Sequence, residues 1–221
     1  INYARRIQTA LLTPQKDIDK TFPENFLLYK PRDIVSGDFY WINQFGDFKV
    51  CILADCTGHG VPGGFISMLG MTNLNYIVNE KELKPDRILN NLREAIIMSL
   101  HQKNIELDGS PKSIENFVNS NMDGMDVAIY IINEREKKLA YAGAHRPLLL
   151  IRNDTITTLK ANNMPVGMHP KLAPFDCINI DLEKGDCIYT FSDGIQDQFS
   201  YNSNMKYTRK RLQDLILSKK S

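Results

Sequence analysis

The spacing of apolar side chains changes several times along the chain, and each change marks a predicted element. Residues 4–12 carry apolar side chains at helical spacing, which predicts a short amphipathic helix that ends before Pro14. Extended segments are predicted next, at about 26–30, 37–45 and 48–54. A helix is then predicted from Pro62, which suits a first turn, to about Glu80, and a second one starts at Pro85.

In most of the second half of the chain, the spacing of apolar residues is typical of strands rather than of helices. Residues 104–122 are polar and rich in Asn and Ser, which predicts an exposed loop or flap. Strands are predicted after this loop, at 125–133, 138–143, 147–152, 155–160, 175–181 and 186–192. A last helix is predicted at about 207–218. Strands, two helices and further strands favour an α+β domain in which helices flank packed sheets.

Two aspartates are predicted to face each other across the first hairpin. The Gly-Asp pair at 46–47 is typical of a two-residue turn, and such a turn pairs Phe45 with Phe48. Counting outward pairs Asp38 with Asp55, whose Cβ atoms would lie roughly 4.5–5.5 Å apart, where like charges destabilise a sheet. Two carboxylates held so close need a shared proton or a cation, so we interpret the pair as a metal site. Apolar residues occupy both faces of this hairpin, which predicts that it is covered on both sides.

Two further aspartates lie at predicted strand ends beside small residues. Asp126 starts one strand in the run Gly-Met-Asp-Val-Ala, and Asp193 follows another in Phe-Ser-Asp-Gly. Carboxylates at strand ends can converge on one point, and an all-oxygen site suits Mg²⁺ or Mn²⁺ rather than Zn²⁺. Each residue has a second interpretation, because both also suit the capping of a turn or of a helix that begins near Ile195.

A glycine-rich loop, residues 56–64, follows Asp55. Its small residues, Gly58 among them, let the backbone approach a ligand and aim a helix N-terminus at an anion. The loop matches neither the standard phosphate-binding motif nor the dinucleotide-binding glycine motif. His59 is interpreted either as a loop residue hydrogen-bonded to its neighbours or as a general acid. The Cys56 thiol has no evident base partner and is not interpreted as a nucleophile.

Composition narrows the function classes further. The chain has 221 residues, 43% of them hydrophobic and 24% charged, which suits one globular domain with a sizeable core. A net charge of +1 gives no reason to expect nucleic acid or a membrane surface as a partner. No apolar run reaches the ~20 residues of a membrane span. Four cysteines without a CxxC pair favour a reducing, cytoplasmic setting.

Five segments resemble, in order, the motifs of the SpoIIE-like bacterial phosphatases, which belong to the metal-dependent PPM class of serine/threonine phosphatases. These segments are VSGDFY at 35–40, ADCTGHGVPG at 54–63, GMDVAI at 124–129, YAGAHRP at 141–147 and FSDG at 191–194. The resemblance runs from about Ile7 to Phe199. It implies a PPM-type β-sandwich flanked by helices, with two Mn²⁺ or Mg²⁺ ions as cofactors.

The resemblance also implies roles for individual residues. Asp55 would bridge the two metals, and the backbone carbonyl of Cys56 would ligate one of them. Asp193 would bind the second metal, and Asp38 would hold the first, directly or through water. Arg32 is the nearest candidate for a phosphate-binding arginine, although a solvated strand-edge arginine is the simpler interpretation.

Other positions have less defined roles in the implied site. Gly58, His59 and Asp126 would support it, and a local hydrogen-bonding role suits Asp126 as well as any metal role. Ala144 stands where eukaryotic-type relatives carry an aspartate, so no third metal is expected there. Two ions roughly 3.5–4 Å apart would activate a hydroxide for in-line attack on phosphorus.

The function implied is hydrolysis of phosphoserine or phosphothreonine on a regulatory protein similar to an anti-sigma-factor antagonist. The alternative is a catalytically incomplete, phosphoprotein-binding regulatory domain, because the Asp-Asp pair that opens the family's final strand has no match after Asp197. We expect residues 1–13 to form a linker or switch helix that joins an upstream sensor domain and offers a homodimer contact. Residues 14–221 would then form the phosphatase domain without its last strand and helix.

Overall fold

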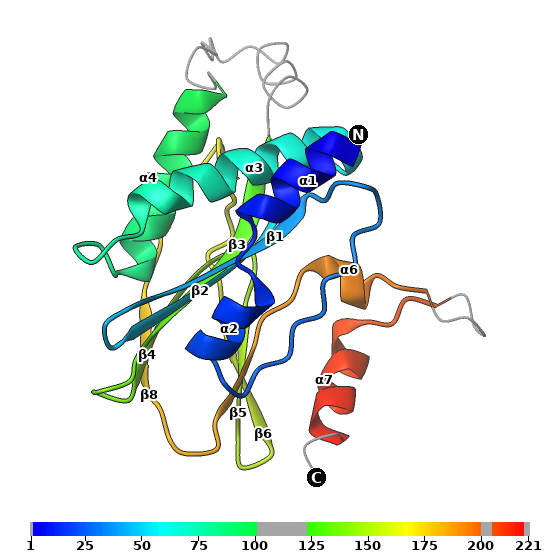
Figure 1. Cartoon of the computed structure of the whole chain (residues 1–221). Coiled ribbons are helices and arrows are strands. Elements are labelled where there is room, and N and C mark those ends of the chain that lie inside the picture. The colour runs from blue at the N-terminus through cyan, green and yellow to red at the C-terminus, as the bar shows by residue number, and fades with distance from the viewer. Residues whose placement is uncertain (1, 101–122, 200–204, 219–221) are drawn as a thin grey trace.

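Two antiparallel sheets pack face to face, and helices cover the outer side of the larger sheet (Figure 1). The structure, a computed structural model, describes residues 2–100, 123–199 and 205–218. The larger sheet has six strands in the order β1-β2-β3-β4-β8, with β7 paired to β3, and the smaller sheet has the order β6-β5-β9. The predicted α+β sandwich flanked by helices is confirmed.

The strands of the larger sheet are β1 (Asp38–Phe45), β2 (Phe48–Cys56), β3 (Gly124–Asn133), β4 (Lys138–Ala144), β7 (Val166–Gly167) and β8 (Ile178–Asp181). The smaller sheet holds β5 (Leu148–Arg152), β6 (Thr155–Leu159) and β9 (Cys187–Tyr189). The helices are α1 (Asn2–Leu11), α2 (Gln15–Thr21), α3 (Gly60–Ile77), α4 (Pro85–Ser99), α6 (Asp193–Gln196) and α7 (Arg209–Ser218). Within the described ranges, none of these helices has the length and apolar character that crossing a lipid bilayer requires.

Helices α3 and α4 pack on the outer face of the larger sheet (Figure 1). The core at this interface includes fully buried side chains from sheet and helices, among them Ile52, Leu74, Leu89 and Ile129. Trp41 Nε1 donates a 2.8 Å hydrogen bond to Asn75 Oδ1, which ties β1 to α3. A Cβ atom on Gly70 would lie 2.9 Å from the Met125 side chain and 3.0 Å from the Phe39 ring. This glycine therefore lets α3 approach the sheet closely.

A second core lies between the two sheets. Its buried members are Ala128, Leu139, Tyr141, Leu148, Leu150 and Leu159. Successive side chains of a strand point to opposite faces, so Ala128 faces this inner core while Ile129 faces the helices. Asp126 lies two positions before Ala128 and is therefore on the inner face of the sheet, at the end of β3.

Most of the predicted elements are confirmed within a few residues, but the strand predicted at 26–30 is wrong. This segment has no partner in a backbone ladder, and Phe26 is 82% exposed. It contacts β1 through a side chain instead, because the Tyr29 hydroxyl donates a 3.2 Å hydrogen bond to the Asp38 carbonyl. The segment therefore adds no strand to the sheet, and β1 remains its edge strand.

Other differences concern short elements. The strand predicted at 175–181 begins later, at Ile178, and the strand predicted at 186–192 ends earlier, at Tyr189. Periodicity does not predict α2 or β7, because seven and two residues are too few to show a period. The loop predicted at 104–122 lies outside the described residues. In the first hairpin, the face toward the helices is buried at Phe39, Trp41 and Ile52 but only half-buried at Phe45 and Phe48 beside the turn. The other face, which includes Tyr40 and Leu53, is half-buried.

Candidate active site

Three aspartates lie side by side on neighbouring strands at one end of the larger sheet. The register pairs Asp38 of β1 with Asp55 of β2, as the two-residue turn predicts, and pairs Asp55 with Asp126 of β3. Asp55 therefore lies between two carboxylates on the inner face of the sheet. Opposed residues of antiparallel strands have Cβ atoms roughly 4.5–5.5 Å apart, so this row concentrates negative charge.

An arginine lies over this row of carboxylates. Arg146 Nη2 donates a hydrogen bond to Asp55 Oδ2, and it lies 3.0 Å from Asp193 Oδ2 and 3.4 Å from Asp126 Oδ2. The Arg146 side chain is only 11% exposed, whereas that of Asp193 is 52% exposed. The acidic cluster is thus buried on the side of the arginine and open to solvent on the side of Asp193.

The backbone around His145 turns Arg146 toward the aspartates. His145 has φ 55°, a conformation that a non-glycine residue rarely adopts, and Arg146 N donates a 2.6 Å hydrogen bond to the Ala144 carbonyl. His145 N donates to the Asn162 carbonyl at 2.9 Å, which holds the turn in place. The ring of His145 also joins the cluster, since its Nδ1 lies 2.8 Å from Asp126 Oδ1. Strained backbone of this kind is typical of functional sites.

A buried tyrosine fixes the carbonyl of Arg146. Tyr141 is fully buried between the sheets, and its hydroxyl donates a 2.6 Å hydrogen bond to the Arg146 carbonyl. Burial raises the pKa of this phenol, so it remains a hydrogen-bond donor at neutral pH. Gly143 makes the contact possible, because a Cβ atom there would overlap the Tyr141 hydroxyl and lie 2.6 Å from the Arg146 carbonyl oxygen.

The fourth aspartate comes from the start of α6. Asp193 is the first residue of this helix and follows Ser192, whose hydroxyl donates a 2.6 Å hydrogen bond to Asp38 Oδ2. This contact joins the β1 end of the aspartate row to the segment that carries Asp193. The N-cap position of α6 belongs to Ser192, so the interpretation of Asp193 as a helix cap is wrong. Asp193 lies in the first turn, and its carboxylate contacts Arg146 in the acidic cluster.

The environment of the cluster shifts the pKa of Asp55. Burial, followed by the negative charge of Asp38, raises the pKa of Asp55 to about 7, and the charge of Arg146 opposes the shift. Burial also raises the pKa of the Cys56 thiol well above its usual value, with the charges of Asp55 and Asp38 adding to the effect. A thiol in this environment stays protonated, which agrees with the interpretation that Cys56 is not a nucleophile.

The glycine-rich loop packs against the strand that carries Asp38. A Cβ atom on Gly37 would lie 2.9 Å from the Gly58 carbonyl oxygen and 3.1 Å from that of Cys56. The loop is also attached to β3, because Thr57 N donates to the Gly124 carbonyl at 2.9 Å and Gly124 N donates to Thr57 Oγ1 at 3.0 Å. The carbonyls of the loop are thus held close to the aspartate row.

Two of the predicted supporting residues lie apart from the contacts of the cluster. His59 precedes α3, and its Nδ1 lies 3.4 Å from Asp33 Oδ2, which favours its interpretation as a loop residue. Arg32 is exposed in the segment before β1, as the solvated interpretation predicts. The arginine that reaches the carboxylates is Arg146 instead. From the sequence alone, Arg146, His145 and Ser192 enter only as parts of motifs, and none of them is assigned a role in the site.

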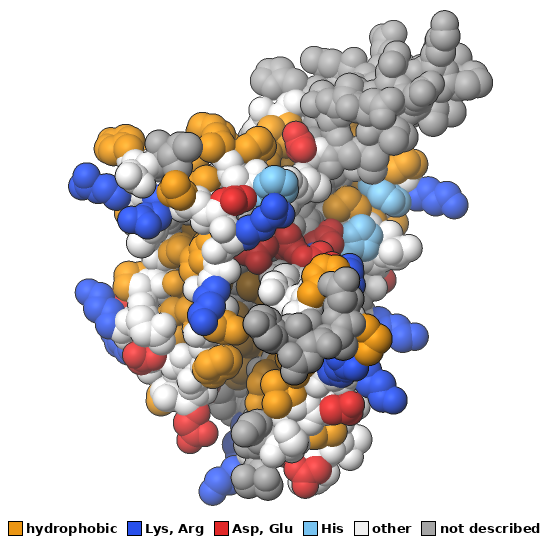
Figure 2. Space-filling model, turned by 90° about the vertical axis from the view of Figure 1, so that its right-hand side faces the viewer, with side chains coloured by type: hydrophobic (Ala, Val, Ile, Leu, Met, Phe, Trp, Pro, Cys, Tyr) orange, Lys and Arg blue, Asp and Glu red, His pale blue; other side chains and the backbone are white. Residues whose placement is uncertain are grey.

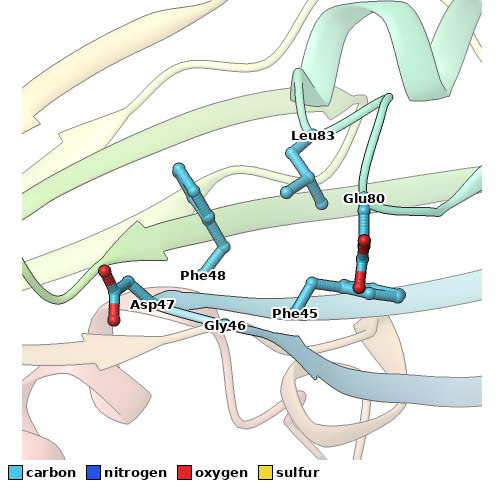
Figure 3. Close-up of a pocket in the computed structure, with 6 residues that line it drawn as sticks. All are labelled: Phe45, Gly46, Asp47, Phe48, Glu80 and Leu83. Atoms are coloured by element: carbon cyan, nitrogen blue, oxygen red, sulfur yellow. The ribbon is translucent and has the colours of Figure 1, made fainter.

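On the surface, the cluster forms an acidic patch with histidine and basic side chains at its margin (Figure 2). A separate hollow lies at the opposite end of the first hairpin. Figure 3 shows Phe45 and Phe48 at the hairpin turn, with Glu80 and Leu83 of the α3–α4 connection above them. Because Asp38 and Asp55 are at the other end of these strands, this hollow is not part of the candidate active site.

The donor chemistry of the cluster fits a divalent cation. Its four aspartates provide only oxygen donors, which suits Mg²⁺ or Mn²⁺. Burial and the charge of Asp38 raise the pKa of Asp55, and a bound cation would favour its ionised form. As the side chains lie, no group of three or more His, Cys, Asp or Glu residues in the described part of the chain is arranged to hold a metal ion. The Arg146 guanidinium lies among three of the aspartates, at the place where their carboxylates come together.

Comparison with known proteins shows the family to which this chain belongs. The family model described as Stage II sporulation protein E (SpoIIE) matches residues 49–221. This chain belongs to the SpoIIE family. It is 27% identical over 194 residues to phosphoserine phosphatase RsbU of Bacillus subtilis (strain 168), which corresponds to 84% of this chain and 50% of RsbU. The chain therefore spans about half the length of that relative.

Solved structures place the SpoIIE-family chain in the PP2C fold, which confirms the PPM class. The SiaA PP2C domain of Pseudomonas aeruginosa has a TM-score of 0.83 and 27% sequence identity, with 98% of this chain and 79% of that chain covered. The RsbU and RsbW domains of a Mycobacterium tuberculosis protein have a TM-score of 0.62 at 18% identity, covering 83% and 46% of the two chains. The second likeness concerns the fold alone.

Proposed function

We propose that this domain is a metal-dependent protein phosphatase that hydrolyses phosphoserine or phosphothreonine on a regulatory protein. The observation that carries the proposal is the row of Asp38, Asp55 and Asp126, with Asp193 beside it, in a chain of the SpoIIE family. Like charges across neighbouring strands destabilise a sheet, so folding alone gives no reason for this arrangement. A cation-binding function does give one.

The proposal assigns a role to each member of the cluster. Two Mn²⁺ or Mg²⁺ ions, when bound, would supply hydroxide for in-line attack on phosphorus and neutralise charge on the phosphoryl oxygens. Asp55 would bridge the ions, since it pairs with Asp38 and shares Arg146 Nη2 with Asp193. The Cys56 carbonyl and Asp38 would hold one ion, and Asp193 the other. Ser192 would orient Asp38 by its hydrogen bond to Oδ2.

We also propose a substrate and partners, on the basis of the names of the relatives. RsbU is named a phosphoserine phosphatase, which supports phosphoserine as the group removed. We propose a small phosphorylated regulator, similar to an anti-sigma-factor antagonist, as the substrate protein. An upstream sensor domain would act through α1. The exposed side chains of Tyr3 and Ile7 on that helix suit a contact between two copies.

Hydrolysis of p-nitrophenyl phosphate and of a phosphoserine peptide, with Mn²⁺ and with EDTA, tests the proposal. We expect turnover that requires Mn²⁺ and that Asp55→Asn reduces by at least roughly a hundredfold, because a metal ligand is lost. The matched control is Asp47→Asn, which changes the exposed turn at the other end of the same hairpin and should keep full activity. Full activity of Asp55→Asn at saturating Mn²⁺ would contradict the proposal.

One observation favours a second function, the binding of a phosphoprotein without turnover. The Arg146 guanidinium, a group well suited to phosphate, lies among the aspartates where metals would bind. A domain of this kind would bind a phosphoserine peptide in EDTA, as measured by fluorescence anisotropy, and would release no phosphate from it when Mn²⁺ is added. Release of phosphate in Mn²⁺ would exclude this second function.

A further inference from the structure

Among the basic residues of the described ranges, Arg146 is notable because one of its nitrogens contacts three carboxylates. Its Nη2 bonds Asp55, lies 3.0 Å from Asp193 and lies 3.4 Å from Asp126. Two of these partners, Asp55 and Asp193, are the residues proposed to bridge and bind the metals. The guanidinium therefore uses the same oxygen atoms that a divalent cation would need.

The Arg146 guanidinium places a positive charge beside the carboxylates, but one of its hydrogen-bond donors has no partner in the described part of the chain. Arg146 Nε is buried, and within the described residues it has no hydrogen-bond partner. A buried donor without a partner costs roughly 1–3 kcal/mol, so this placement of the side chain is not optimal for the arginine itself. The backbone of Arg146, in contrast, is held firmly by the Tyr141 hydroxyl and the turn at His145. The backbone position of Arg146 is thus fixed by contacts that do not involve its guanidinium.

We propose that Arg146 is a built-in counter-cation that occupies the acidic cluster in the metal-free domain and competes with divalent metal for it. In this state it neutralises the row of aspartates, which would otherwise repel one another within a sheet. Metal entry displaces the guanidinium toward the open side of the cluster, where Asp193 is exposed. The competition sets the metal concentration at which the site fills. This inference rests on the proposed metal-dependent function.

The Mn²⁺ dependence of thermal unfolding, at fixed pH and ionic strength, tests the competition for three proteins. These are the natural chain, Arg146→Met and Arg152→Met. Methionine keeps an unbranched apolar stem and removes the charge. Arg152 is the matched control because it also pairs with two acids, Glu183 and Asp186, each at 2.7 Å, outside the cluster.

We expect Arg146→Met to melt at a lower temperature than the natural chain in EDTA, because its aspartates have lost their counter-ion. We also expect it to reach half of its Mn²⁺-induced stabilisation at a concentration at least about tenfold lower, because no cation has to be displaced. Arg152→Met should respond to Mn²⁺ like the natural chain. An equal or weaker Mn²⁺ affinity of Arg146→Met would overturn the inference and leave the proposed function intact. If neither protein responds to Mn²⁺, both the inference and the proposed function fail.

A second measurement tests the inference even if Arg146→Met does not fold. In ¹⁵N-labelled natural protein, the Arg146 Nε–H resonance is observed during titration with Mg²⁺, and Arg146→Lys assigns it by its loss. Displacement predicts a large shift of this resonance and faster exchange of its proton with water, because buried Nε becomes exposed. A resonance that stays unchanged while Mg²⁺ stabilises the protein would show that the metal binds without moving Arg146, and would overturn the inference.

Discussion

Ser192 Oγ donates a 2.6 Å hydrogen bond to Asp38 Oδ2, although 154 positions separate the two residues in the chain. The contact connects the first strand of the larger sheet to the start of α6. It therefore determines how far Asp38 lies from Asp193, the residue next to Ser192. A hydroxyl from the FSDG segment thus helps to assemble the acidic cluster.

Replacement of Ser192 by alanine should destabilise the metal-free domain. A hydrogen bond to a charged group contributes about 1.5–3 kcal/mol, and Asp38 would lose one. Urea unfolding in EDTA at pH 7 measures the change. Thr155→Ala is the control, since it removes an exposed hydroxyl whose contact with the Asn153 carbonyl is long, at 3.5 Å. Equal unfolding free energies of the two variants would show that the Ser192 contact contributes nothing.

The metal-free domain should lose stability as the pH rises from about 4 to about 7. The pKa of Asp55 is about 7 in the folded chain, against an ordinary value of 3.8, because burial and the charge of Asp38 disfavour its ionised form. Between these values the folded state keeps a proton that the unfolded state has released, so the free energy of unfolding falls with increasing pH. Below about 4 this penalty is absent, and above about 7 it is complete and constant.

The contribution of Asp55 to stability is measured from unfolding free energies in EDTA across this pH range. The two proteins compared are the natural chain and Asp55→Asn. The difference between the two proteins should change steadily from pH 4 to pH 7, with the variant gaining relative stability. Asparagine cannot ionise, so it avoids the penalty at high pH. A difference that does not vary with pH would mean that the environment of Asp55 leaves its titration unchanged.

Gly143→Ala should disrupt the support of Arg146. Its Cβ atom would overlap the Tyr141 hydroxyl, and overpacking of this kind typically costs about 1–3 kcal/mol. The double variant Gly143→Ala with Tyr141→Phe removes the overlapping oxygen. It should therefore be less destabilised than the sum of the two single variants, in a double-mutant cycle of urea unfolding. Strict additivity would show that the two residues do not interact.

A buried glutamine joins α1 to the rest of the domain. Gln8 is 3% exposed, and its Nε2 donates hydrogen bonds of 2.7 Å to the Ser36 carbonyl and to Ser67 Oγ. Gln8→Ala should destabilise the domain by about 1–3 kcal/mol, because buried polar partners are left unsatisfied. Gln15→Ala, which changes an exposed glutamine of α2, should have little effect on the melting temperature. Equal losses in the two variants would contradict the role of Gln8.

The local part of the site was accessible from sequence, and the part that depends on distant segments was not. A two-residue turn determines the register of the strands that flank it, so the pairing of Asp38 with Asp55 is predictable. The glycine pattern after Asp55 and the apolar stripes of α3 and α4 are local signals of the same kind. Together with the order of the strands, they predicted an α+β domain with flanking helices, and the family resemblance implied the PPM-type sandwich.

The sequence by itself determined that two carboxylates meet on one hairpin, because nearest-neighbour geometry is enough for that result. Only the tertiary structure decided which groups join them. Asp126 lies beside Asp55 through pairing of β2 with β3, two strands that are separated in the chain by α3 and α4. Arg146 reaches the cluster because His145 adopts φ 55°, a conformation that a histidine in the sequence does not predict. The counter-charge of the site therefore depends on long-range packing, which no local pattern encodes.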